Sequence, residues 1–136
     1  MERKEAIRSA YRLTGSINME IKQFGVQKGK KIMLLHGNLM CWRQFEDVIP
    51  LLENTYCVYA VSFDGFDGTG EITYTTAQEQ AHKLEVYIRE NCGGHLNVLF
   101  AESLGCGPAI LLKISTGSNR PHDPQRTGIS GLRHPE

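Results

Sequence analysis

The fold is decided by the stretch Leu96-Asn97-Val98-Leu99-Phe100-Ala101-Glu102-Ser103-Leu104-Gly105. Residues 96–101 form an apolar run typical of a strand buried on both faces, and helix-like apolar content resumes over residues 104–113. Ser103 therefore stands at a sharp turn from strand to helix, which projects its Oγ above the sheet. Ala101 and Gly105, two residues to either side, are small, as the crowding of strand and helix requires. The segment predicts a nucleophile elbow in which Ser103 is the nucleophile and the N–H of Leu104 is one oxyanion donor.

A second oxyanion donor is predicted in the loop after an earlier strand. Residues 32–35 are apolar on both faces, as in a central parallel strand, and they end at His36-Gly37-Asn38. Glycine at position 37 permits the tight backbone path that such a loop needs. We expect the backbone N–H of Asn38 to be the second donor. His36 belongs to this loop, so we expect a hydrogen-bonded structural histidine and no acid or base role.

The rest of the first 113 residues alternates predicted strands and helices. The pattern predicts a helix over residues 42–53, a buried strand over 57–61 and a Gly- and Asp-rich loop over 64–70. Thr76 stands three residues before Glu79, a capping-box signature for a helix that runs to Cys92 and stops at Gly93-Gly94. Residues 16–24 alternate like a half-buried strand near a sheet edge, and the first dozen residues indicate a short helix. This order predicts an α/β fold with a mostly parallel sheet and flanking helices.

With strand-HGN, helix, strand-DGFDGTG, capped helix and strand-AESLG in that order, the chain resembles the N-terminal half of the α/β-hydrolase family over about Ile17 to Lys113. The resemblance implies the first part of an α/β-hydrolase domain over residues 1–113, through the nucleophile elbow. It assigns the nucleophile to Ser103 and the oxyanion hole to the backbone N–H groups of Asn38 and Leu104. It implies a serine hydrolase that acts on an ester or other acyl bond of a small-molecule substrate, with no cofactor and no metal.

A serine nucleophile also needs a base and an acid that orients the base, and in this family both follow the serine in the chain. The candidates after the serine are His122, Asp123, His134 and Glu136. All four lie in residues 114–136, a stretch rich in Ser, Thr, Gly, Pro, Arg and His with no hydrophobic period, which we expect to be disordered. No later buried strand is predicted to hold them. We therefore expect a truncated or frame-shifted hydrolase, weakly active or inactive.

Two other interpretations remain open from the sequence. The chain could be a natural half-hydrolase, a non-catalytic scaffold for binding, with the unpaired edge of strand 96–101 as its contact surface and a tendency to self-associate there. A nucleotide-binding or methyltransferase-like domain would place Gly65, Gly68 and Gly70 in the ligand loop. That loop does not open a helix directly, so phosphates would lack the helix N-terminus they usually use. In addition, residues 105–110 form only a broken dinucleotide-binding motif.

Several polar and sulfur-containing residues have plain structural interpretations. Glu102 and Asp64 are expected to face solvent or to cap loops, and not to serve as catalytic acids. Cys57 and Cys92 lie on predicted core faces, and Cys106 is expected to be a small packing residue beside the serine. The four cysteines form no C-x-x-C pair, so reduced thiols are expected.

Composition narrows the classes of partner and compartment. Fifteen Lys+Arg balance 15 Asp+Glu, which disfavours nucleic acid and anionic membranes as partners. No apolar run approaches the roughly 18 residues of a membrane helix, and the charged start, residues 1–5, has no apolar signal core behind it. We expect a soluble, cytoplasmic protein. A length of 136 residues fits one domain, yet the motifs match only the front half of a larger sheet.

Overall fold

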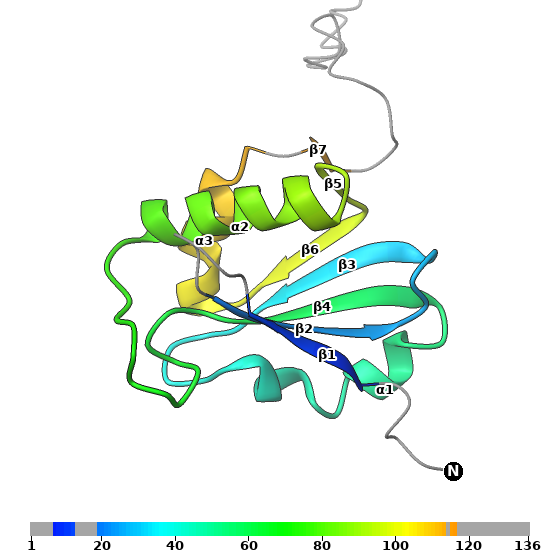
Figure 1. Ribbon diagram of the computed structural model, residues 1–136, viewed down its shortest axis with the longest axis horizontal. Coiled ribbons are helices and arrows are strands. Elements are labelled where there is room, and N and C mark those ends of the chain that lie inside the picture. Colours follow the sequence, from blue (N-terminus) through cyan, green and yellow to red (C-terminus); the bar gives the residue numbers. More distant parts are fainter. Residues whose placement is uncertain (1–6, 13–18, 114, 117–136) are drawn as a thin grey trace, which may run out of the picture.

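The computed structural model describes residues 7–12, 19–113 and 115–116. They form strands β1 (Ile7–Arg12), β2 (Glu20–Gly25), β3 (Lys30–Leu35), β4 (Tyr56–Ser62), β5 (His95–Leu96), β6 (Val98–Ala101) and β7 (Ser115–Thr116), 3-10 helices η2 (Trp42–Phe45) and η3 (Ser103–Gly105), and helices α1 (Ile49–Leu52), α2 (Ala77–Asn91) and α3 (Cys106–Leu111) (Figure 1).

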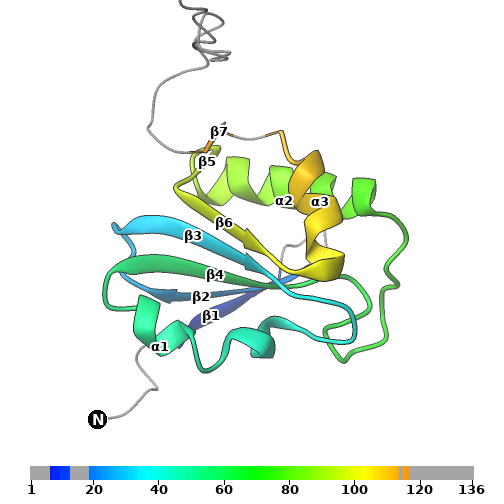
Figure 2. The ribbon, with the colours of Figure 1, turned by 180° about the vertical axis from the view of Figure 1, so that it is seen from behind.

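The main sheet has five strands in the order β1-β2-β4-β3-β6. Strands β4, β3 and β6 are parallel, whereas β1, β2 and β4 pair antiparallel. The α/β class is confirmed, but the sheet is mixed where the sequence predicted a mostly parallel one. Helices α2 and α3 lie on one side of the sheet, and η2 and α1 lie on the other (Figures 1 and 2).

The antiparallel part contains the clearest error of the sequence prediction. Residues 7–12, predicted as part of a short helix, form β1, which pairs with β2 from Ile7 opposite Phe24 to Arg12 opposite Glu20. Strand β2 consequently has neighbours on both sides and lies one strand in from the sheet edge, in agreement with the position near an edge that was predicted for it. Helix propensity is a weak prior, and pairing with a partner strand overrides it. Of the predicted strand over residues 16–24, positions 16–18 lie outside the described residues.

The helix predicted over residues 42–53 is two short elements. Trp42, Phe45 and Ile49 are buried, but η2 ends at Phe45 and α1 begins only at Ile49. Pro50 explains the break, because proline has no N–H to donate and its ring clashes with the carbonyl four residues earlier. Val48, expected on the buried stripe, is 43% exposed.

Helix α2 agrees with its sequence signals at both ends. The Thr76 side chain accepts a hydrogen bond from the Glu79 N–H at 3.1 Å, as in a capping box. At the other end Gly93 and Gly94 have φ of 64° and 73°, and the Gly94 N–H donates to the Ile88 carbonyl at 3.0 Å. Such left-handed backbone closes a helix at little cost only when glycine supplies it.

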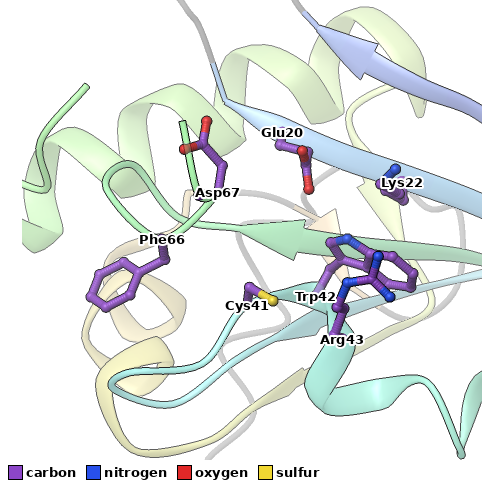
Figure 3. A pocket seen from close by; sticks show the side chains of 8 residues that line it. Glu20, Lys22, Cys41, Trp42, Arg43, Phe66 and Asp67 are labelled. Atoms are coloured by element: carbon purple, nitrogen blue, oxygen red, sulfur yellow. The ribbon is translucent and has the colours of Figure 1, made fainter. Parts of the chain in front are cut away.

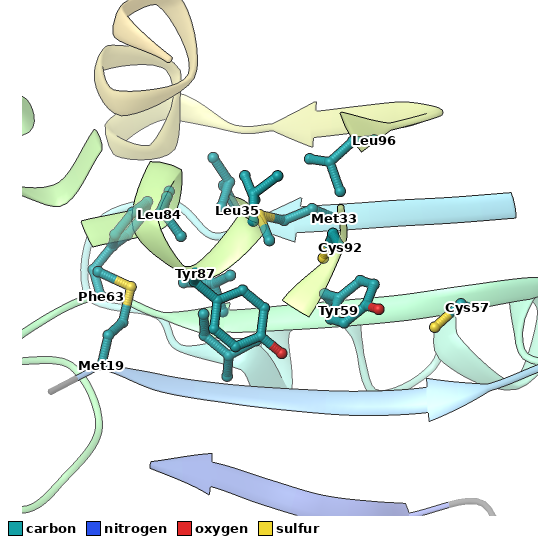
Figure 4. Close-up of a cluster of buried hydrophobic side chains, with 13 residues drawn as sticks. Met19, Met33, Leu35, Cys57, Tyr59, Phe63, Leu84, Tyr87, Cys92 and Leu96 are labelled. Carbon is teal, nitrogen blue, oxygen red and sulfur yellow. The ribbon is translucent and has the colours of Figure 1, made fainter. Parts of the chain in front are cut away.

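Buried side chains form two clusters, one on each face of the sheet. The cluster beneath α2 is larger and is shown in Figure 4; its sheet residues include Met33, Leu35, Tyr59 and Val61, which pack against Leu84, Tyr87 and Ile88. The cluster on the other face contains Ile32, Leu34, Val58, Ala60, Trp42, Phe45 and Ile49. The predicted central strands over residues 32–35 and 57–61 are thus confirmed as β3 and β4, buried on both faces.

The strand before the serine is less buried than predicted. It is divided at Asn97, which exchanges hydrogen bonds with the Lys31 backbone at 2.8 and 2.9 Å. Beyond it, β6 is the last strand of the main sheet among the described residues. Val98 and Phe100 are 40% and 47% exposed on the face toward η2 and α1, so the expectation of burial on both faces is wrong for β6.

Most of the predicted tail lies outside the described residues. Ser115 and Thr116 form β7 and pair in parallel with β5, while residue 114 and residues 117–136 are not described. The disorder predicted for 114–136, and the division at residue 113, therefore stay predictions. Within the described part, no helix has both the length and the apolar character needed to span a bilayer.

Candidate active site

Ser103 occupies a strained turn between β6 and the helix that follows. Glu102 is extended, with φ −125° and ψ 136°, and Ser103 then takes φ 47° as the first residue of η3, which leads directly into α3. Among the described residues, only Ser103 and Leu39 combine a positive φ with a side chain. A left-handed backbone costs a non-glycine residue about 1–2 kcal/mol. The exposed Ser103 thus has the conformation expected of a nucleophile elbow.

Two glycines bring the serine turn against the end of β3. A Cβ on Gly105 would lie 2.9 Å from the Leu35 Cβ and 2.9 Å from the carbonyl oxygens of Leu35 and His36, so no larger residue fits there. A Cβ on Gly37 would lie 3.6 Å from the Ser103 Cβ. The small residue predicted two positions after the serine is thereby explained, and the HGN loop is placed directly beside Ser103.

His36 is buried, and both of its ring nitrogens are engaged. Its Nε2 accepts a hydrogen bond from the Phe63 N–H at 2.9 Å, so the proton is on Nδ1, which donates to the Gly37 carbonyl at 2.7 Å. Burial lowers the pKa of His36, and the bond to Gly37 opposes this only in part. A neutral ring without a free nitrogen cannot take the proton of Ser103, in line with the structural role predicted for it.

The predicted oxyanion residues lie on the two loops that meet at this point. Asn38 is exposed, and its side-chain oxygen accepts the Leu39 N–H at 3.0 Å. The Met40 N–H donates to the Gly37 carbonyl at 3.3 Å, which closes the turn. Leu104 follows the serine in the first turn of the helix, where N–H groups have no partner within the helix. That the N–H groups of Asn38 and Leu104 bind an oxyanion stays a prediction.

Gln44 is a site residue that the sequence analysis missed. Its Oε1 accepts the Gly37 N–H at 2.9 Å, and its Nε2 donates to the Glu102 carboxylate. Glu102 is exposed, as predicted, but this bridge also fastens it to the oxyanion loop. A glutamine in η2 thus joins the residue before Ser103 to the loop beside it. No local pattern indicates this, because the contact joins positions 58 residues apart.

Asp64 is buried, contrary to the prediction of a solvent-facing or loop-capping residue. Its backbone N–H donates to Gln80 Oε1 at 3.1 Å, and its carboxylate accepts from Gln80 Nε2 at 2.8 Å and forms an ion pair with Lys83. The Asp64 and Lys83 side chains are only 2% and 9% exposed. This network fixes the start of the 64–70 loop to α2. The sequence contains one sign of this network. Gln80 and Lys83 are polar residues next to the apolar face of α2, close to Ala81.

The cysteines agree with the sequence prediction except at one position. Cys57 and Cys92 are free and buried, and burial raises the pKa of the Cys92 thiol to about 11. Cys106 is free but exposed, so it is not the packing residue expected beside the serine. Its Sγ lies 3.6 Å from the Ala101 carbonyl oxygen.

The groups that would complete a catalytic triad are not among the described residues. His122, Asp123, His134 and Glu136 lie outside them, and the described positions after Ser103 include no Asp, Glu or His. The described part also holds no cluster of three or more His, Cys, Asp or Glu side chains suited to a metal ion. The structure therefore places a serine and two flanking loops, and it leaves the base and acid untested.

Two adjoining hollows open between the loop after β3 and the loop after β4. One, of about 500 Å³, is lined by Leu39, Met40, Cys41, Gly65, Phe66 and Gly68. The other, of about 300 Å³, shares Cys41, Phe66 and Gly68 with it and adds Trp42 and four charged side chains, Glu20, Lys22, Arg43 and Asp67 (Figure 3). An apolar hollow thus continues into a charged one.

Comparisons with solved structures identify the fold to which these loops belong. A protein from Desulfitobacterium hafniense assigned to the α/β-hydrolase family superposes with a TM-score of 0.65 at 24% identity, over 68% of this chain and 37% of its own. The chain forms part of an α/β-hydrolase fold. Neither a family model nor a curated protein sequence matches it.

Further matches agree on this partial α/β-hydrolase fold. A protein from Pseudomonas aeruginosa assigned as an epoxide hydrolase is 17% identical with a TM-score of 0.62, over 74% of this chain and 34% of its own. A haloalkane dehalogenase variant from Bradyrhizobium elkanii is 21% identical with a TM-score of 0.58, over 67% of this chain and 30% of its own. The chain spans about a third of the length of these structures. At such identities the likeness shows the fold alone.

Proposed function

We propose that this chain carries the nucleophile of an α/β-hydrolase-type serine hydrolase, with Ser103 as the nucleophile and an ester or other acyl bond as its target. The observation that carries the proposal is the left-handed backbone of Ser103, φ 47°, at an exposed strand-to-helix turn. Strain of this kind is kept at functional sites. Ser103 also lies beside Gly37, at the loop that would supply the second oxyanion donor.

The chemistry follows from the position of Ser103 between two loops. Its Oγ attacks the acyl carbonyl, and the carbonyl oxygen gains negative charge as the new C–O bond forms. The N–H groups of Asn38 and Leu104 are the proposed donors to that oxygen, and donors of this kind contribute a large part of catalysis in acyl transfer. The serine proton must pass to a base and then to the leaving alcohol, whereupon water hydrolyses the acyl-enzyme.

We expect this chain to be weakly active or inactive. His36 has no free nitrogen for the proton, and the candidates His122, Asp123, His134 and Glu136 have no described position near Ser103. Where a triad's serine or histidine has been removed, kcat falls on the order of a million-fold, and only oxyanion-hole and binding effects remain. The proposal therefore predicts slow acylation of Ser103 and no rapid turnover.

A fluorophosphonate probe tests the proposal directly, because it phosphonylates activated serines. Labelling of the full chain is expected at Ser103, located by mass spectrometry of the labelled peptide, and Ser103→Ala should abolish it. Thr73→Ala, which removes an exposed hydroxyl from a loop on the described surface, is the matched control and should label as the parent does. Labelling no faster than that of the unfolded chain would contradict an activated serine.

A second candidate function is a non-catalytic scaffold that binds partners, or itself, at β6. In its favour, β6 is the last strand of the main sheet in the described part, and it contains no charge or proline to protect its edge. Val98 and Phe100 are half exposed beside an apolar hollow of about 420 Å³ that Phe45 and Val48 also line. A paired strand would cover this surface.

Size-exclusion chromatography with light scattering tests whether the chain self-associates, as the scaffold function predicts. Self-association that rises with concentration and is lost in Phe100→Lys supports it. Ile110→Lys is the matched control, because Ile110 is 82% exposed on α3, outside the sheet edge. A monomer at all concentrations, together with labelling of Ser103 that is faster than in the unfolded chain, would favour the enzyme over the scaffold.

A further inference from the structure

The loop beside Ser103 holds apolar side chains in solvent. Leu39 is 86% exposed and Met40 is 45% exposed, and Leu39 also has φ 61°, a conformation that costs a leucine about 1–2 kcal/mol. Neither side chain contributes to the buried clusters. Exposed apolar groups on a strained loop are a feature of binding surfaces.

These two side chains line the apolar hollow, and Phe66 lines it as well. Two neighbouring rings hold Phe66 in place: its ring centroid lies 5.3 Å from that of His36 and 6.1 Å from that of Tyr74. Its loop is fixed in turn by the Phe66 N–H, which donates to the Phe63 carbonyl at 2.9 Å. The hollow is therefore lined by an aromatic ring with fixed neighbours and by the more adaptable side chains of leucine and methionine.

The loop that lines the hollow also contacts the serine turn. Gly37 approaches Ser103 so closely that a Cβ on Gly37 would be 3.6 Å from the Ser103 Cβ, and the turn closed by the Met40 N–H joins Gly37 to Leu39. On the other side, the ring beneath Phe66 belongs to His36, the residue before Gly37. A group bonded to the carbonyl that Ser103 attacks would lie beside the loop that lines this hollow.

We propose that the hollow between Leu39, Met40 and Phe66 binds the apolar acyl group of the ester whose carbonyl Ser103 attacks, an assignment that rests on the proposed function. Leu39, Met40 and Phe66 all precede Ser103 in the chain. The site selects unbranched acyl groups of short to medium length. Beyond Phe66 the charged hollow with Glu20, Lys22 and Asp67 begins, and a longer apolar chain would desolvate those charges without pairing them.

Binding of methyl butanoate and methyl hexanoate to Ser103→Ala protein tests the site without any need for turnover. Ligand-observed NMR titration gives both dissociation constants. Each buried CH₂ strengthens binding by about fourfold, so two added CH₂ groups should give roughly 15-fold tighter binding. In the triple variant with Leu39→Ser and Met40→Ser this ratio should fall toward one. Leu51→Ser is the matched control, because Leu51 is 79% exposed on α1 and lines no hollow described above, and it should keep the full ratio.

The outcomes separate this site from the proposed chemistry. Equal affinity for the two esters, or an unchanged ratio in the Leu39→Ser and Met40→Ser variant, would overturn the acyl site. Self-association removed by the same two substitutions would assign the surface to a second copy and would overturn it as well. A clear ratio in Ser103→Ala protein, combined with no fluorophosphonate labelling of the parent chain, would retain the acyl site and reject Ser103 as an activated nucleophile.

Discussion

Replacement of Ser103 by glycine should stabilise the protein, while replacement by alanine should not. Ser103 is exposed and has φ 47°, so neither change leaves a buried cavity, and both remove the hydroxyl. Alanine keeps the left-handed strain of about 1–2 kcal/mol, and glycine removes it. Glycine also makes the unfolded chain more flexible, which costs about 0.5–1 kcal/mol. The difference leaves Ser103→Gly more stable than Ser103→Ala by about 0.5–1 kcal/mol.

Thermal unfolding measures this difference. For a domain of this size it corresponds to a rise in Tm of about 2–5 °C for Ser103→Gly over Ser103→Ala. Thr73 is the control position, since it is exposed and has no positive φ. There the order should reverse, with Thr73→Gly less stable than Thr73→Ala by about 0.4–1 kcal/mol. If Ser103→Gly unfolds at a lower temperature than Ser103→Ala, the serine is not strained and the elbow argument fails.

Three further predictions concern the parts that hold the serine in place. Gly105→Ala should lower the free energy of unfolding by about 1–3 kcal/mol, because the added Cβ would lie 2.9 Å from three atoms at the end of β3. Urea unfolding measures the loss, and Gly107→Ala, whose Cβ would have its nearest contact at 3.3 Å, is the control. Asp64→Ala should cost about 3–5 kcal/mol, because the buried Lys83 charge would keep only the half-exposed Glu79 carboxylate, 3.9 Å away, as a partner. A double-mutant cycle with Lys83→Met should recover part of that loss. His36 has a lowered pKa in the folded state, so unfolding takes up a proton below about pH 6.5, and stability should fall as the pH drops from there toward the folded pKa. In this range the free energy of unfolding should change by up to about 1.4 kcal/mol per pH unit, and His36→Gln should remove this dependence. An unchanged pH dependence in His36→Gln would contradict its assignment to His36.

Local signals explain which elements could be predicted from the sequence. Helix α2 carries a cap at Thr76 and a glycine stop at Gly93, and both determine structure within a few residues. The buried strands β3 and β4 and the serine turn likewise have patterns complete within six to ten residues. Prediction from the sequence succeeds there because neighbouring residues supply the physical cause.

The errors arise where distant residues decide. Strand β1 forms because it pairs with β2. The residues within 7–12 do not by themselves favour a strand over a short helix. The burial of Asp64 depends on Gln80 and Lys83, 16 and 19 positions away. The bridge from Gln44 to Glu102 spans 58 positions. The candidate site could thus be named from the sequence, but not the contacts that position its loops.

The two strained residues of the described part show that the serine loops are not arranged for stability. Ser103 and Leu39 are both exposed, so packing does not require either side chain, and glycine would adopt each backbone at lower cost. The structure uses glycine at other left-handed positions, such as Gly93 and Gly94, where only a helix has to end. Serine and leucine nevertheless stand at the two left-handed positions of the loops that meet at the end of β3. Their left-handed backbones make folding less favourable than glycine would. The proposed chemistry accounts for this cost, because the Ser103 hydroxyl attacks a carbonyl and the Leu39 side chain contacts the acyl chain attached to that carbonyl.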